Sequence, residues 1–425
     1  MKETVKTGIL ALLIAISLLQ SYFLIYRLPG SNPVVKSGED YVATDNMGTQ
    51  LAAADLVYPE QMIIHMGNSK HTVFYPNSTF YNLIFGRLQG RLMDGFQRGV
   101  TMNTDWSRIR NEDQGIELQF GSGIPVPLLQ KVMQIADDPL LDGESISRIF
   151  IYTDKGEDKV RVFFFSAQGD VVYEATKADF TVQDLKQHVA FGKNWTPYTL
   201  VNGTYYIPDK PLDTAKVSLE VGKYTVEQMQ RSLFFDPSIT RNIREKDNSE
   251  IYTDSKRSLQ VRQDQNWMNY TDPAAASAGE NSPEKNALSA VEFVNQHGGW
   301  SGRYLIRLSD ETDGRQTVLF QQYYGAYPII DMPDFHYGVM QLEMRQGTTT
   351  SYERSLLYLK EENRAKQVVR LPGGEELKRR IAAAAKEGQV IKLYPAYQPK
   401  LDKSGLTLTP VWVVKLHDGS ERILP

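Results

Sequence analysis

Residues 149–175 read IFIYTDKGEDKVRVFFFSAQGDVVYEA, and this stretch gives the clearest indication of the fold. Apolar runs rich in aromatic and β-branched residues occupy 149–152, 160–165 and 171–175. The sequences between them are Asp154-Lys155-Gly156 and Gln168-Gly169-Asp170. Short apolar runs separated by glycine-containing turns are typical of antiparallel hairpins. The stretch therefore predicts an antiparallel sheet.

Helical patterns accompany the predicted strands, which places the chain in the α+β class. After a proline-bounded break at 208–211, Thr225 and Gln228 form a capping box that opens a short helix. The other elements expected in this part are a strand at 73–75, helices over 79–92 and 127–136, and strands at 239–251 and 259–270.

The C-terminal third repeats a pattern of one helix followed by antiparallel strands. Ser282 is a predicted N-cap, Pro283 takes the first helical position, and Gly298 ends the helix. A second helix is expected over 375–386, with Gly388 after it. The strands expected here lie at 304–308, 318–324, 339–344, 356–359, 390–394 and 408–416. Such units cover one face of a sheet with a helix and leave the other face for contacts.

The N-terminal region contains a run of 19 residues without charge, at 8–26. As a helix this run would be about 28 Å long, close to the ~30 Å thickness of the hydrocarbon core of a bilayer. Lys2 and Lys6 precede it, so the positive-inside rule predicts a cytoplasmic N-terminus and an extracellular bulk. The run lacks a small-residue cleavage site at its end. We therefore expect a single-pass anchor in the cell membrane and not a cleaved signal peptide.

Two sides of this predicted helix differ in character. The small residues Gly8, Ala11 and Ala15 share one side, and Ser17, Gln20 and Ser21 share the opposite side. Helices associate in lipid through small residues and interhelical hydrogen bonds, so each side is a candidate contact with a partner helix. The amide of Gln20 favours a partner, because an unpaired amide in hydrocarbon is costly. A lone anchor with chance small-residue spacing is the alternative.

The expected domain layout follows from these elements. It comprises a cytoplasmic N-terminus (1–7), a transmembrane helix (8–26), a juxtamembrane tether (27–50), an N-terminal α+β domain (51–210), a central α+β domain (211–281) and a C-terminal α+β domain (282–425).

The composition offers few signs of catalytic chemistry. The 425 residues include 47 basic and 51 acidic ones, a net charge of -4 that gives no basic field for nucleic acid. There is no cysteine, and none of the six histidines has metal-site spacing. Gly121-Ser122-Gly123 is followed by prolines and not by a helix, so it is no phosphate-binding loop. We expect no enzyme activity, catalytic residue, cofactor or metal. An exported wall-modifying enzyme or a cell-wall-associated binding module remains the alternative.

Several segments resemble one family of bacterial regulators. They are Glu3-Thr4-Val5-Lys6, the stretch LFFDPSITR at 233–241, the stretch IYTDSKR at 251–257, the region 321–328 and the stretch LTPVWVV at 408–414. Together they resemble the YycH (WalH) family over nearly the full length, and the C-terminal units also look like the relative YycI.

The resemblance implies three extracytoplasmic domains without enzymatic activity. It further implies that the transmembrane helix associates with those of a YycI-like protein and of a cell-wall-sensing histidine kinase of the YycG (WalK) type. The expected function is therefore membrane-anchored regulation of that kinase in two-component signal transduction and cell-wall homeostasis. The resemblance supplies no ligand and no catalytic residue.

Overall fold

The computed structural model describes Lys6, Ile16, Ser17 and residues 47–154, 158–262, 266–273, 281–386, 388–403 and 405–424. The predicted transmembrane helix and tether lie outside these residues, apart from Ile16, Ser17 and residues 47–50. Within the described residues, no helix is long and apolar enough to cross a membrane. Residues 44–425 form one unit, and its three sheets are described below.

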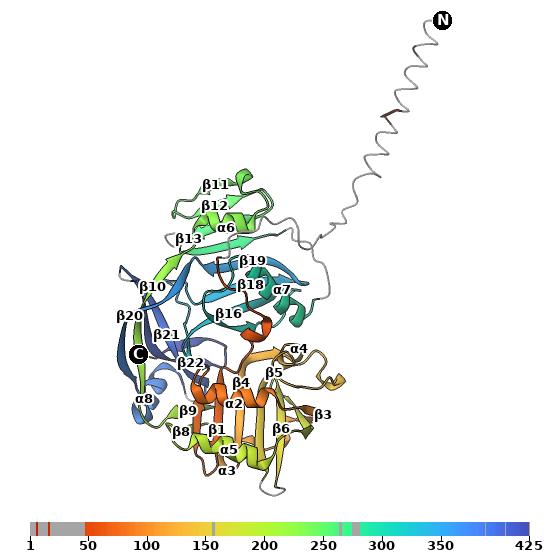
Figure 1. Ribbon diagram of the computed structural model, residues 1–425, viewed down its shortest axis with the longest axis vertical. Coiled ribbons are helices and arrows are strands. Elements are labelled where there is room, and N and C mark those ends of the chain that lie inside the picture. Colours follow the sequence, from red (N-terminus) through yellow and green to blue (C-terminus); the bar gives the residue numbers. More distant parts are fainter. Residues whose placement is uncertain are drawn as a thin grey trace. The chain divides into compact units, whose positions relative to one another are not determined.

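The first sheet contains the hairpins around which the fold was predicted (Figure 1). Its strand order is β3-β7-β6-β5-β4-β1-β2-β8-β9. The strands are β1 (Gln61–Met66), β2 (His71–Phe74), β3 (Met93–Val100), β4 (Gln114–Pro125), β5 (Ser145–Asp154), β6 (Lys159–Ser166), β7 (Val171–Ala178), β8 (Tyr198–Val201) and β9 (Tyr205–Pro208).

Both faces of the first sheet are covered, because its strands carry apolar side chains on both sides. The helices α2 (Thr79–Gln89) and α5 (Val182–Gly192) pack on one face. The short helix α3 (Trp106–Glu112) packs on part of the other face through Trp106 and Ile109. The rest of that second face meets the second sheet, where Ile63 shares a cluster with Tyr394 and Val413.

The second sheet has the order β20-β10-β22-β21, with β23 paired to β22. Helix α8 (Gly374–Ala384) packs against it through Leu377 and Ile381, which share a core cluster with Trp412. The strands are β10 (Leu212–Lys223), β20 (Leu357–Leu371), β21 (Val390–Asp402), β22 (Gly405–Leu416) and β23 (Glu421–Ile423).

The third sheet has the order β11-β12-β13-β14-β19-β18-β16-β15, with β17 paired to β16. Helix α7 (Pro283–Gln296) packs on it, and α6 (Val226–Leu233) contributes to the same core cluster. The strands are β11 (Arg241–Arg244), β12 (Glu250–Thr253), β13 (Ser258–Arg262), β14 (Trp267–Thr271), β15 (Arg303–Leu308), β16 (Gln316–Tyr324), β17 (Tyr327–Pro328), β18 (Val339–Arg345) and β19 (Thr348–Ser355).

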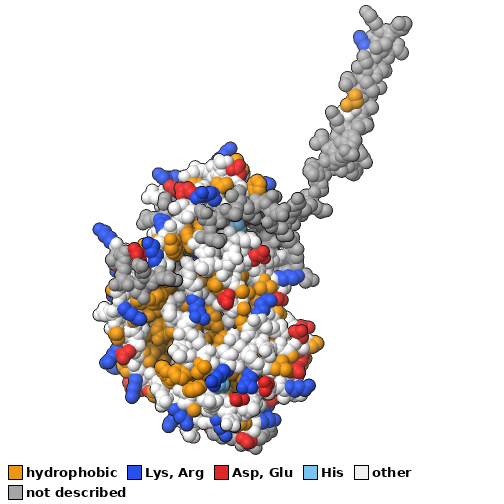
Figure 2. Space-filling model, in the orientation of Figure 1, with side chains coloured by type: hydrophobic (Ala, Val, Ile, Leu, Met, Phe, Trp, Pro, Cys, Tyr) orange, Lys and Arg blue, Asp and Glu red, His pale blue; other side chains and the backbone are white. Residues whose placement is uncertain are grey.

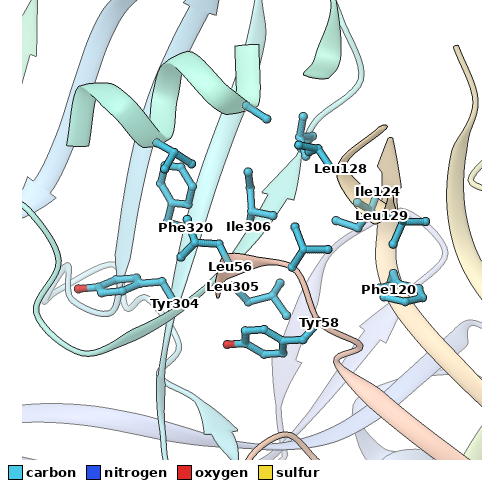
Figure 3. Packing of buried hydrophobic residues seen from close by; sticks show 14 of the residues in the cluster. Leu56, Tyr58, Phe120, Ile124, Leu128, Leu129, Tyr304, Leu305, Ile306 and Phe320 are labelled. Carbon is cyan, nitrogen blue, oxygen red and sulfur yellow. The ribbon is translucent and has the colours of Figure 1, made fainter. Parts of the chain in front are cut away.

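The largest core cluster joins the first sheet to the third (Figure 3). Phe120 and Ile124 of β4 share this cluster with Leu305 and Ile306 of β15 and with Leu56. The remaining short elements are α4 (Val126–Leu129) and the 3-10 helices η1 (Ala53–Leu56), η2 (Thr101–Asn103), η3 (Pro139–Leu141) and η4 (Pro237–Ile239). Burial of this shared cluster stabilises the packing of one sheet on the other.

The α+β class with antiparallel sheets is confirmed. All pairings between named strands in the described part of the chain are antiparallel. The capping box of α6 is present, since Thr225 Oγ1 accepts from the backbone N–H of Gln228 and the Gln228 side chain accepts from that of Thr225. Ser282 caps α7 as predicted, with its hydroxyl accepting from the backbone N–H of Lys285.

Several element predictions were wrong in extent. The helix expected over 127–136 stops at Leu129, because the chain then pairs with the start of β3 through Met93 and Ile135. The strands expected at 239–251 and 259–270 are instead the hairpins β11–β12 and β13–β14. The strand at 356–359 opens β20 in the second sheet, after the unpredicted β19. Helix α8 ends at Ala384, before Gly388.

Strand pairing crosses the expected domain boundaries. Strand β10 pairs with β20 and β22, although the boundary expected at 281 lies between them in sequence. Strand β14 likewise pairs with β19. The boundaries themselves stay predictions. Because of these pairings, residues 211–281 and 282–425 contribute strands to the same two sheets.

Candidate functional site

A cavity of about 440 Å³ lies where the first sheet meets the second. Side chains from all three sheets and from α3 line it. The charged residues among them are Arg110 of α3, Arg148 of β5, Arg307 of β15, Lys392 of β21, Lys415 of β22, Glu421 of β23 and Glu60, which immediately precedes β1. Trp106, Phe165 and Tyr394 supply aromatic walls.

Glu60 connects the three sheets at one edge of the cavity. Its Oε1 atom accepts from Nε of Arg307 at 2.8 Å, and its Oε2 atom pairs with the ammonium group of Lys392. Glu60 is 6% exposed. Burial opposes ionisation of this carboxyl, but Arg307 and Lys392 outweigh it and lower the pKa of Glu60 to about 2. The group is therefore a carboxylate at neutral pH.

The loop Gly121-Ser122-Gly123 packs against Glu60. It is a bulge between Gln119 and Ile124, where the pairing of β4 with β5 is interrupted. Gly121 has φ of +66°, and a Cβ atom there would lie 2.5 Å from Glu60 Oε1. Position 121 needs glycine because its φ is positive and because a side chain would clash with Glu60. Glycine here lets the loop pack closely against Glu60 at the cavity wall.

A second buried carboxylate, Glu117, lies behind the cavity. Nε of Arg110 donates to its Oε2 atom at 2.8 Å, and Nη1 of Arg148 lies 3.4 Å from its Oε1 atom. Nε2 of Gln119 also donates to Oε1, at 3.1 Å. Burial opposes ionisation of Glu117, but the two guanidinium groups hold its pKa well below the ordinary value. Two cations thus share one carboxylate.

Two histidines extend this network on the same face of the first sheet. The pairing of β1 with β2 sets His65 opposite His71, and their Nδ1 atoms lie 3.0 Å apart. Nε2 of His65 is 3.3 Å from Glu117 Oε2, and Nε2 of His71 is 3.3 Å from Asn111 Oδ1. Both rings are fully buried. Burial lowers the pKa of each, to about 3 for His71.

This site was not found from the sequence, where the six histidines were considered only for metal-site spacing. The available signal was the spacing of His65 and His71 in a tight hairpin, which sets them opposite each other across the two strands. Within the described residues, no group of three His, Cys, Asp or Glu side chains is arranged to hold a metal ion. The pair is a buried polar element of the network.

Two family models together match nearly the whole chain, and each residue of the cavity lies within one match or the other. The model described as the N-terminal domain of YycH protein matches residues 3–190, and that of the C-terminal domain matches residues 202–424. The chain belongs to the YycH family. The resemblance stated from the sequence is thereby confirmed.

Members of the YycH family with known sequence or structure align over most of the chain. A Bacillus subtilis (strain 168) protein, described as the two-component system WalR/WalK regulatory protein YycH, is 20% identical over 98% of this chain and 95% of its own length. The crystal structure of YycH from Bacillus subtilis superposes with a TM-score of 0.70, at 18% identity, over 89% of this chain and 98% of that chain. This likeness confirms the fold.

The predicted helix contacts lie mostly outside the described residues of this YycH family member. Gly8, Ala11, Ala15, Gln20 and Ser21 are not described, and Ser17 is an exposed residue in helical conformation. Their contact with partner helices stays a prediction. The charged residues of the cavity and of the Glu60 and Glu117 networks were not singled out from the sequence.

Proposed function

We propose that this chain is a membrane-anchored, extracytoplasmic regulator of a two-component system of the WalR/WalK type. The observation that carries the proposal is the succession of both YycH family models along one chain, together with a relative described as a regulatory protein of that system. The uncharged run at 8–26 supports a cell-membrane location with the N-terminus in the cytoplasm.

The regulator acts through its transmembrane helix, which contacts the helices of a WalK-type sensor kinase and of a YycI-like membrane protein within the lipid bilayer. The two sides of the helix support two separate contacts, one by small-residue packing and one by hydrogen bonds. Under this proposal Ala11 and Ala15 serve one partner, and Gln20 serves the other.

The regulator is not an enzyme. A general base works best when its pKa lies near the operating pH, whereas the pKa of Glu60 is about 2. Glu117 forms ion pairs with Arg110 and Arg148. The buried carboxylates of the cavity are therefore poorly suited to proton transfer, which favours regulation over the alternative of a wall-modifying enzyme.

Co-purification with face-specific variants tests the two contacts. We expect Ala11→Leu with Ala15→Leu to lose one partner, either the kinase or the YycI-like protein, and Ser17→Leu with Gln20→Leu and Ser21→Leu to lose the other. Ile14→Leu with Ile16→Leu, placed between the two sides, is the matched control and should keep both. Retention of both partners by both face variants would contradict the proposal. An anchored binding module would behave in that way.

A further inference from the structure

We infer that the cavity between the first and second sheets binds a small organic anion that carries phosphate or carboxylate groups. The inference concerns a ligand site in the folded unit and does not depend on the proposed helix contacts. Its volume of about 440 Å³ lies within the range of small-molecule sites.

The cavity has more positive than negative charge. Its lining includes five basic residues and two acidic ones. Glu117 is not in the lining, but it pairs with two of the lining arginines. If it is counted, five cations face three carboxylates. Glu60 is shared by Arg307 and Lys392, and Glu117 is shared by Arg110 and Arg148. An anion placed here would meet donors that the protein's own carboxylates leave partly unused.

Lys415 is the clearest unused cation. It is half-buried on β22 and forms no ion pair with any residue that the structure describes. Burial is the main cause of the lowered pKa of Lys392, and Lys415 adds to it. Lys415 also adds to the lowering of the Glu60 pKa by Arg307 and Lys392. The acidic side chains of the cavity lining are Glu60 and Glu421, which lies opposite Lys415 in the pairing of β22 with β23. The five cations of the lining outnumber these two carboxylates, so a bound anion would supply further negative charge.

The surroundings of Arg148 also contain too little negative charge to balance the buried cations. Burial and the neighbouring Arg110 lower the pKa of its guanidinium, despite the attraction of Glu117. The guanidinium lies over the ring of Phe165, with Cζ of Arg148 4.5 Å from the ring centroid. A guanidinium held in this way has a fixed orientation and can bind an oxyanion through several N–H groups.

The other lining residues define the class of ligand. Trp106 and Tyr394 offer apolar surface beside the cations. A ligand with one anionic end and an apolar or ring-shaped body would match both. Figure 2 shows basic and acidic side chains interspersed over one face of the described surface, so that face has no comparable single-sign patch. The cavity concentrates positive charge where the outer surface shown does not.

Calorimetric titration of the purified full-length protein in dodecyl maltoside tests the inference. The probes are inorganic phosphate, pyrophosphate and citrate, each compared with sodium chloride at matched ionic strength. We expect saturable binding of at least one probe, weakened at least tenfold by Lys415→Gln. Phosphate-class binding is indicated if pyrophosphate binds and citrate does not, and carboxylate-class binding by the reverse.

Lys400→Gln is the matched control, because Lys400 is an exposed lysine on β21 outside the cavity. It should bind the probes as the unmodified protein does. Lys415→Gln breaks no ion pair of the described residues, so we expect an unchanged unfolding midpoint. Lys415→Glu should abolish binding. It is the substitute test if Lys415→Gln does not fold. Absence of saturable binding of all three probes, or equal binding by the Lys415 variants and the unmodified protein, would overturn the inference.

Discussion

Oε1 of Glu60 accepts a hydrogen bond from Nε of Arg307 at 2.8 Å, although 247 positions separate the two residues. The same carboxylate pairs with Lys392, so one buried side chain connects all three sheets. Removing one partner from a buried ion pair leaves an uncompensated charge, which typically costs about 3–5 kcal/mol. Glu60 therefore contributes, beside the shared hydrophobic clusters, to the packing of the first sheet on the other two.

Substitution of Glu60 by Gln should lower the free energy of unfolding by about 3 kcal/mol or more, because Arg307 and Lys392 would both lose their carboxylate. Urea unfolding monitored by circular dichroism measures this change. Glu376→Gln, which breaks an exposed pair with Arg380 on α8, is the control and should change little. Equal effects of the two substitutions would show that Glu60 has no special structural role.

Gly121→Ala should destabilise the fold more than alanine at another glycine with similar backbone geometry. Gly143→Ala is the matched control, since Gly143 has φ of +73° with open space around it. Alanine at 143 meets only the backbone penalty, about 1 kcal/mol. Alanine at 121 would also press on Glu60, which its ion pairs hold in place. We expect the unfolding midpoint to fall further for Gly121→Ala, and an equal fall would contradict this explanation.

Acidification should destabilise the fold below pH 6.5 through the buried histidine pair. The folded-state pKa of His71 is about 3, whereas the unfolded value is about 6.5, so the unfolded state binds more protons between these limits. Stability is therefore full above pH 6.5 and decreases as the pH falls. For His71 alone the loss between pH 7 and 5 is about 2 kcal/mol.

Urea unfolding across pH 5 to 7.5 measures this dependence. His71→Gln should reduce the pH dependence of stability, because the variant lacks one titrating ring. Part of it should remain, because burial also lowers the pKa values of His65, His188 and His297. His417→Gln replaces an exposed histidine outside the buried pair and is the control. If the unmodified protein is equally stable at pH 5 and pH 7, the histidine pair does not titrate as described.

Local signals in the sequence were enough to predict many of the elements. The hairpins within 149–175 and the caps of α6 and α7 depend on residues within a few positions of one another. Strand β19 was missed because its sequence, TTTSYERS, is polar although half of it is buried. The hairpin β11–β12 was taken for one strand, since the turn at Asn248, with φ of +65°, has only a weak sequence signal.

The candidate site could not be predicted, for a different physical reason. Glu60 and Lys392 are 332 positions apart, and the pairing of such residues depends on how sheets pack. No local pattern distinguishes Glu60 or Lys415 from an ordinary surface charge. The contact site predicted within 8–26 stays a prediction, and it could be proposed because lipid imposes strong rules on short segments.

The most direct test of the proposed regulation is replacement of residues 8–26 by a poly-leucine helix of equal length, with phosphorylation of the partner response regulator measured in cells. The proposal predicts that the protein stays in the membrane fraction at its normal level while its effect on phosphorylation is lost. Phosphorylation that is regulated as fully by the poly-leucine protein as by the unmodified one would contradict it.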